Sequence, residues 1–149
     1  MDTPDRVVLG ITVDCTNART LGEFWMAALG YVPASPPQGW DTWESWLTDH
    51  DVPPEEWDDG TSICDPAGAY PTISFLKVPE PKTAKNRMHL DVKVSGGRHL
   101  SAEERSPRIE AKVAELVALG GTVQRRDELR GRLDHVVMLD PEGNEFCVA

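Results

Sequence analysis

Two pairs of alternating residues carry the side chains best suited to chemistry. His89 and Asp91 lie two positions apart in the apolar stretch 88–94, and Glu145 and Cys147 lie two apart near the end of the chain. Both stretches are expected to be β-strands, in which alternate side chains share one face. A neutral histidine acts as an acid or a base near pH 7, and a carboxylate beside it orients the ring or binds a ligand. These residues are therefore the candidate catalytic or binding groups.

Each of these residues also has a structural interpretation. A lone histidine on a strand is often structural, and Asp91 would simply be solvated at the rim of a sheet. No sequence neighbour lowers the pKa of Cys147, which favours a buried structural thiol over a nucleophile. Glu145 is the acid that best fits an additional ligand role.

The elements that must position these residues occur twice. Asp65-Pro66-Ala67-Gly68 recurs as Asp140-Pro141-Glu142-Gly143, and in such a turn Pro fits the bend and Gly supplies the permissive backbone. An amphipathic helix that ends in Leu-Gly precedes each copy, at Leu29-Gly30 and at Leu119-Gly120. The duplication predicts one domain of class α+β over residues 1–149. In it two βαβββ modules, at about 5–80 and 86–149, form a curved eight-stranded mixed sheet around a cleft.

In the first module, Asn17 is a plausible N-cap for a helix over 18–29 that ends at Gly30. Residues 33–60 are predicted to be a helical insertion that the second module lacks. Asp41 opens its first helix through a capping-box pattern with Glu44. A second helical turn begins near Pro54. The first module's strands are predicted at 7–13, 61–65 and 72–78.

In the second module, Ser106 is the expected N-cap and Pro107 the first residue of a helix that runs to Leu119. Its inward positions are Ile109, Val113, Leu116 and Val117. The strands of this module are predicted at 88–94, 122–126, 136–140 and 145–148.

Composition narrows the class of protein. The formal net charge is −10, which argues against a nucleic-acid or anionic-membrane binder because such contacts need clustered positive charge. No apolar run approaches the roughly 20 residues of a membrane span. The polar start shows no signal peptide and the three cysteines show no paired spacing, so a cytoplasmic protein with reduced thiols is expected.

The paired modules, the helix ends and the closing motif Asp140 to Phe146 resemble the vicinal oxygen chelate superfamily, which includes glyoxalase I, extradiol dioxygenases, fosfomycin-resistance enzymes and bleomycin-binding proteins. The linker Val78 to Lys82 and the run Lys85 to Asp91 are similar to its glyoxalase-like branch. The resemblance implies a small-molecule ligand and a homodimer. It covers the chain outside the insertion.

Metal-using members of that superfamily place four ligands in the cleft, two from each module. When these four ligand positions are transferred to this sequence, they fall near Val8, at Ser74 or Leu76, at His89 and at Cys147. One imidazole and one thiol bind Mg²⁺ or Mn²⁺ poorly, and zinc only if Glu145 or Asp91 joins them. We therefore expect the purified protein to contain no metal cofactor. The alternative is that it binds a divalent metal.

Two functions follow from the resemblance. The first is a small-molecule-binding protein of the bleomycin-resistance type whose cleft holds an apolar or aromatic metabolite or natural product. The second is an enzyme of the same superfamily, such as a lyase or isomerase, that uses His89 with Asp91 or Glu145. The tryptophans of the insertion, Trp43 and Trp46 above all, either roof the ligand or fix the inserted helices to the sheet. Further ligand contacts are assigned to Ser74, Arg87 and Cys147, with Arg87 in a locally basic run that either holds an anion or is a solvated turn.

Overall fold

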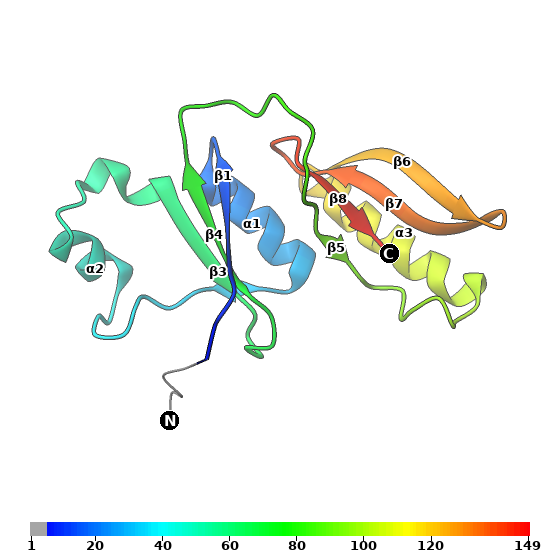
Figure 1. The fold of residues 1–149 in the computed structure, drawn as a ribbon, viewed down its shortest axis with the longest axis horizontal. Helices are drawn as coiled ribbons and strands as arrows, with labels where there is room; N and C mark the ends of the chain where they lie inside the picture. The colour runs from blue at the N-terminus through cyan, green and yellow to red at the C-terminus, as the bar shows by residue number, and fades with distance from the viewer. Residues whose placement is uncertain (1–5) are drawn as a thin grey trace. The chain divides into compact units, whose positions relative to one another are not determined.

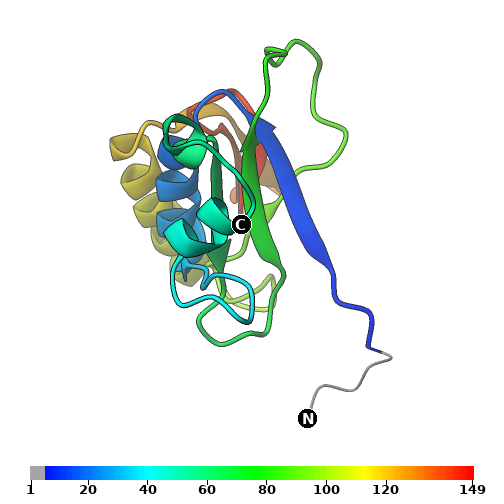
Figure 2. The ribbon, with the colours of Figure 1, turned by 90° about the vertical axis from the view of Figure 1, so that its left-hand side faces the viewer.

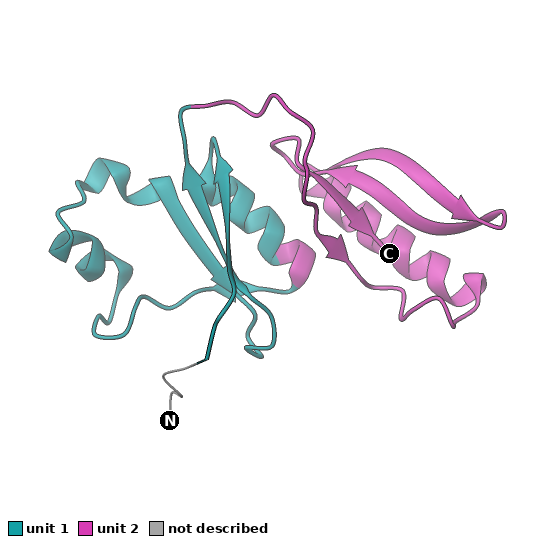
Figure 3. Ribbon diagram, in the orientation of Figure 1, with its two compact units in different colours: residues 1–26, 30–79 teal, residues 27–29, 80–149 magenta. Residues whose placement is uncertain are grey.

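A computed structural model describes residues 6–149 and contains two compact units (Figure 3). Unit 1 comprises the chain up to residue 26 together with residues 30–79, and unit 2 comprises residues 27–29 and 80–149. The predicted start of module one, at residue 5, lies outside the described residues. No helix in the described part of the chain is long and apolar enough to cross a membrane.

Unit 1 contains a four-stranded mixed sheet and one long helix. The strand order is β1-β4-β3-β2, with β1 parallel to β4 and the other neighbours antiparallel (Figure 1). The short strand β2 was not predicted, and β1 lies two to three residues later than predicted. The elements of the sheet and its helix are β1 (Gly10–Cys15), α1 (Ala18–Leu29), β2 (Val32–Pro33), β3 (Gly60–Cys64) and β4 (Thr72–Lys77).

Local signals place α1 where the sequence predicts it. The side chain of Asn17 accepts a hydrogen bond from the backbone N–H of Thr20 at 3.1 Å, which satisfies a free donor of the first turn. Gly30 ends the helix with φ of 69°, a left-handed conformation that glycine adopts without steric cost. The buried face consists of Leu21, Phe24, Trp25 and Ala28.

The insertion forms two short helices, α2 (Trp43–Asp49) and the 3₁₀ helix η1 (Pro54–Asp59). In Figures 1 and 2 they lie beyond β3, on the side of unit 1 away from β1. The predicted cap at Asp41 is wrong: Thr42 is the N-cap, because its hydroxyl lies one residue before the helix and accepts from the N–H of Ser45 at 3.1 Å. Pro54 opens η1 as predicted.

Unit 2 repeats the plan of unit 1. The strand order is β5-β8-β7-β6, with β5 parallel to β8 and the other neighbours antiparallel. Its helix contacts β6, β7 and β8 and so covers one face of the sheet. The elements are β5 (Asp91–Val92), α3 (Ala102–Ala118), β6 (Thr122–Leu129), β7 (Arg132–Leu139) and β8 (Glu145–Val148).

The predicted start of α3 at Ser106-Pro107 is wrong. The helix begins after Ser101, whose side chain accepts from the N–H of Glu104 while the Glu104 carboxylate accepts from the N–H of Ser101, a complete capping box. Pro107 lies inside the helix, where it removes the hydrogen bond to the carbonyl of Glu103. Because Glu103 is exposed, water can replace that bond.

The buried face of α3 also differs from the prediction at one position. Ile109, Val113 and Leu116 are buried as expected, but Val117 is 47% exposed. The earlier helix start adds Arg105 to the buried face, in place of Val117.

The hairpin of β6 and β7 is longer than predicted. Leu129 pairs with Arg132, so the loop contains only Arg130 and Gly131, with φ of 54° and 73°. Two consecutive left-handed residues are typical of the tight turn that matches the twist of a hairpin.

The duplicated turns have the same structure in both units. The N–H of Gly68 bonds to the carbonyl of Asp65 at 2.9 Å, and Gly143 repeats this bond with Asp140 at 2.9 Å. Each aspartate also accepts backbone N–H bonds from the residues that follow it. The prediction of two βαβββ modules with eight strands is confirmed, each module having its own four-stranded mixed sheet.

Candidate functional site

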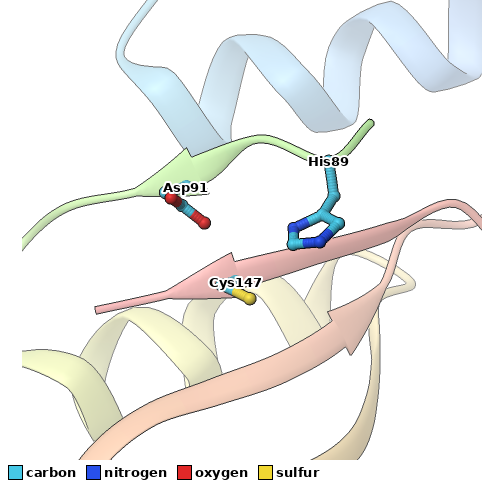
Figure 4. A group of neighbouring side chains, drawn as sticks. All are labelled: His89, Asp91 and Cys147. Atoms are coloured by element: carbon cyan, nitrogen blue, oxygen red, sulfur yellow. The ribbon is translucent and has the colours of Figure 1, made fainter. Parts of the chain in front are cut away.

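Three polar side chains converge on the sheet of unit 2. The ligand atoms of His89, Asp91 and Cys147 all lie within 4.8 Å of one another, and Figure 4 shows the imidazole extending toward the other two. The parallel register of β5 and β8 creates this cluster, because Asp91 lies directly opposite Cys147. His89 lies just before β5, which covers only Asp91–Val92 of the strand predicted at 88–94. The bond from the N–H of Cys147 to the carbonyl of Leu90 at 3.0 Å extends the pairing of β5 by one residue, to Leu90.

The cluster lies on the face of the sheet opposite α3. Arg126 of β6 forms an ion pair with Glu110 of α3, with two N–O distances of 3.0 Å, which identifies its side as the helix-covered face. The adjacent Arg125 therefore belongs to the other side, together with its cross-strand partner Val137. Cys147 pairs with Val137 and shares that side. We call this side, which Asp91, Cys147, Val137 and Arg125 cross in one row, the open face because α3 does not cover it, although Val137 and Cys147 are themselves buried.

Cys147 is a neutral thiol in this setting. Its side chain is buried, with the residue 9% exposed, and burial is the main cause that raises its pKa above the ordinary value of 9.0. The negative charge of Asp91 and a hydrogen bond from the thiol to Asp91 raise the pKa further. This agrees with the expectation that Cys147 is no activated nucleophile.

His89 is exposed and its ring forms no hydrogen bond with any described residue. The sequence predicted that His89 forms a hydrogen bond with a neighbouring polar group or with water. Within residues 6–149, no protein group forms a hydrogen bond with the ring. The imidazole is therefore available for proton transfer or for binding a cation or ligand.

Glu145 shares the open face but lies outside the cluster. Its carboxylate forms an ion pair with Lys85, which lowers its pKa, and its backbone N–H donates to the Asn86 side chain at 3.2 Å. Because Lys85 engages Glu145, Asp91 is the carboxylate that accompanies His89. Of the predicted acids, the structure thus brings Asp91 and not Glu145 to the imidazole.

Sequence analysis missed a second group of charges on the open face. Both carboxylate oxygens of Asp127 accept from Arg125 Nε at 3.0 Å, and His135 Nε2 lies 3.0 Å from Asp127 Oδ2. The i,i+2 spacing of Arg125 and Asp127 in a polar strand was an available signal, but their alignment with Cys147 depends on the register of three strands.

The remaining predicted site residues belong to other elements of the chain. Arg87 is exposed in the segment before β5. Ser74 belongs to β4 of unit 1, where its hydroxyl lies 2.9 Å from that of Ser62. The indole N–H of Trp43 donates to the carbonyl of Ala34 at 2.8 Å. Trp46 packs edge-on against Trp43 and stacks on His50, with ring centroids 5.7 and 4.3 Å apart.

The profile of the family described as "Glyoxalase-like domain" matches residues 10–149. The chain belongs to the glyoxalase-like domain family. Curated protein sequences give no match. Among solved structures, a glyoxalase/bleomycin resistance protein/dioxygenase family enzyme from Burkholderia phytofirmans PsJN is 16% identical, with 93% of each chain covered and a TM-score of 0.59.

Two fosfomycin resistance proteins have the same fold. FosX from Mesorhizobium loti is 8% identical over 96% of this chain and 90% of its own, with a TM-score of 0.60. A mutant of FosX from Listeria monocytogenes, complexed with Mn(II) and 1S,2S-dihydroxypropylphosphonic acid, is 11% identical over 99% and 90%, with a TM-score of 0.58. At these identities the likeness shows the fold alone. Together with this shared fold, the family match over residues 10–149 confirms the predicted resemblance to the glyoxalase-like branch.

The duplication tests whether this glyoxalase-like chain can hold the four-ligand metal site of its relatives. Ser74 lies opposite Ser62 and Cys147 lies opposite Val137, and both of these partners stand three residues before the aspartate of their turn, so Ser74 and not Leu76 is the counterpart of Cys147. Ser74 pairs in turn with Thr12, as Cys147 pairs with Asp91. The same register makes Gly10, rather than Val8, the counterpart of His89. Unit 1 therefore offers one hydroxyl and no strong donor at these positions.

Unit 2 alone supplies a donor set of different chemistry. One imidazole nitrogen, one carboxylate oxygen and one sulfur are three of the four donors of a tetrahedral zinc site, and such three-ligand sites leave the fourth position open. Mn²⁺ and Mg²⁺ prefer six oxygen-rich ligands. The cluster thus fits a zinc-like cation and does not fit the hard cation of the FosX complex. When bound, such a cation would supply Lewis acidity at the open face.

Proposed function

We propose that this glyoxalase-like protein binds a small molecule on the open face of unit 2, at His89, Asp91 and Cys147. The observation that carries the proposal is their convergence: three groups suited to chemistry lie within 4.8 Å of one another, and His89 and Asp91 are exposed. Exposed polar groups that converge are typical of ligand sites, in which they fix orientation and specificity. The sequence favoured an apolar or aromatic ligand, and we assign a polar group to the part that meets this cluster.

Replacing His89 by Ala is expected to remove ligand binding without unfolding the protein, because the ring is exposed and forms no bond to a described residue. A small-molecule library screened by ligand-observed NMR would give hits for the wild type that H89A no longer binds. H99A is the matched control, since His99 is an equally exposed histidine in the loop before α3. Hits that bind H89A as well as the wild type would contradict the proposal.

A second function, an enzyme such as a lyase or isomerase, is supported by the unbonded ring of His89 beside the carboxylate of Asp91. In that arrangement His89 is the acid or base and Asp91 orients it or shares the proton. The same NMR screen separates the two functions. New product resonances that appear with the wild type and not with H89A support the enzyme, whereas ligands that bind unchanged support the binding protein.

We also propose that the protein is a homodimer in a reducing compartment such as the cytoplasm. β1 is an edge strand, and the residues just before it, Val7, Val8 and Leu9, are 94%, 81% and 67% exposed. Edge strands and exposed apolar runs are usually covered. Cys64 and Cys147 are free thiols, which supports a reducing compartment.

Light scattering coupled to size exclusion should give twice the chain mass for the wild type and the monomer mass for a V7D/L9D variant. The two introduced carboxylates would destabilise the dimer if residues 7 and 9 are buried in its apolar interface, and would have little effect if these residues stay exposed to solvent. The wild type running as a monomer at tens of micromolar would contradict the dimer.

A further inference from the structure

Arg125 lies in the same cross-strand row as the cluster. Asp91 pairs with Cys147, Cys147 with Val137, and Val137 with Arg125, which carries the row across all four strands of unit 2. Neighbouring strands lie about 4.8 Å apart, so the backbones of Cys147 and Arg125 are separated by about 10 Å. A small metabolite is long enough to reach from one to the other.

The guanidinium of Arg125 is held in place from one side. Its Nε donates to both carboxylate oxygens of Asp127 at 3.0 Å. Asp127 is in turn held by Nε2 of His135, and Nδ1 of His135 lies 2.9 Å from the carboxylate of Asp134, which is buried. A side chain anchored through such a series loses less conformational entropy when it binds a ligand.

The rest of that guanidinium is free to bind. Nη1 and Nη2 of Arg125 form no hydrogen bond to any described residue, and 58% of the side chain is exposed. Paired N–H donors in a plane match the geometry of a carboxylate or phosphate group.

We infer that Arg125 binds an anionic group, carboxylate or phosphonate, of the ligand whose other end meets His89, Asp91 and Cys147. The inference rests on the proposed function and adds a specificity-determining residue to it. It assigns the ligand class as small organic oxyanions. Asp127 and His135 act through Arg125 and are positioning residues.

The test compares R125Q with R126Q. Arg126 is the adjacent residue in β6, but its side chain lies on the helix-covered face and pairs with Glu110, so R126Q removes the same charge without touching the open face. The probes are phenylphosphonate, benzoate and the uncharged benzyl alcohol, titrated into labelled protein by NMR. R125Q should weaken binding of the anions by roughly 10- to 100-fold, the cost of a charged hydrogen-bonded contact, and R126Q should not.

Comparing benzoate with phenylphosphonate shows which anionic group Arg125 recognises. Loss of both in R125Q indicates general oxyanion recognition, and loss of phenylphosphonate alone indicates a preference for the phosphonate; either result supports the inference. Anions that bind R125Q as well as the wild type overturn it, as does a wild type that binds neither anion. If R125Q keeps the library ligands that H89A loses, the role assigned to Arg125 is wrong but the proposed binding site at His89 stands. If H89A also keeps these ligands, the proposed function is wrong as well as the role of Arg125.

Discussion

Replacing Cys147 by Ser should weaken zinc binding by at least about 100-fold, since loss of even an outer partner of a zinc ligand costs roughly 10- to 100-fold. The wild type is expected to be metal-free after dialysis, to take up one added Zn²⁺ or Co²⁺, and to bind Mn²⁺ weakly. Absorption of the Co²⁺ form measures this directly, because a sulfur ligand gives an intense charge-transfer band. D91N and H89A should also weaken binding.

C64S is the matched control for the thiol. Cys64 is a free cysteine in β3 of unit 1, away from the cluster in the chain, and its loss should leave the Co²⁺ spectrum unchanged. Tight Mn²⁺ binding, or a Co²⁺ spectrum that survives C147S, would contradict the assignment of the three donors. If a stoichiometric amount of metal stays bound at His89 after dialysis, the enzyme becomes the favoured function over the binding protein.

The second large effect is expected at Asp134, a buried carboxylate of unit 2. It accepts two bonds of 2.8 Å from Arg98, and one of 3.3 Å from Arg105, which is 8% exposed. D134A would leave the Arg105 charge buried without its carboxylate, and breaking a buried pair in this way costs about 3–5 kcal/mol. Urea denaturation of both proteins at pH 7 measures this loss in the free energy of unfolding.

The pH dependence of that loss has a definite sign. Hydrogen bonds from Arg98 and then His135 lower the pKa of Asp134 far below its ordinary 3.8. A depressed pKa in the folded state contributes stability that is complete above the ordinary value and is lost as the pH falls toward the folded one. The difference between wild type and D134A should therefore be constant near neutrality and shrink below about pH 4.

E110Q is the control for this measurement. Glu110 pairs with Arg126 on the surface, and exposed pairs contribute about 0–1 kcal/mol, so this variant should change the free energy of unfolding little. A D134A variant no less stable than E110Q would show that Arg105 finds another partner or water.

Local chemistry allowed most of the elements to be predicted. Asn17 and Gly30 bound a helix by hydrogen bonds within a few residues, and the Asp-Pro-x-Gly turns at Asp65 and Asp140 close in the same way. Such signals are complete in a short stretch of chain, so their duplication was enough to predict two βαβββ modules. Strand alternation predicted that His89 and Asp91 lie close together, and they do, although His89 itself lies just before β5.

Where two local signals competed, tertiary packing decided. Ser101 with Glu104 and Ser106 with Pro107 both encode helix starts, and the prediction from the sequence used only the second. The earlier start makes Arg105 helical and buries it against Asp134, a contact between residues 29 positions apart that no local pattern contains.

The sequence by itself determined the two modules, their long helices, the repeated turns and the pairing of His89 with Asp91, because each depends on short-range hydrogen bonding or on the period of a strand. Only the tertiary structure decided the rest of the site. The parallel register of β5 on β8 brings Cys147 to Asp91, the Lys85 contact removes Glu145 from the cluster, and the antiparallel register of β6 aligns Arg125 with both. Register joins strands far apart in the chain, and a shift of one residue would turn these side chains to the opposite face.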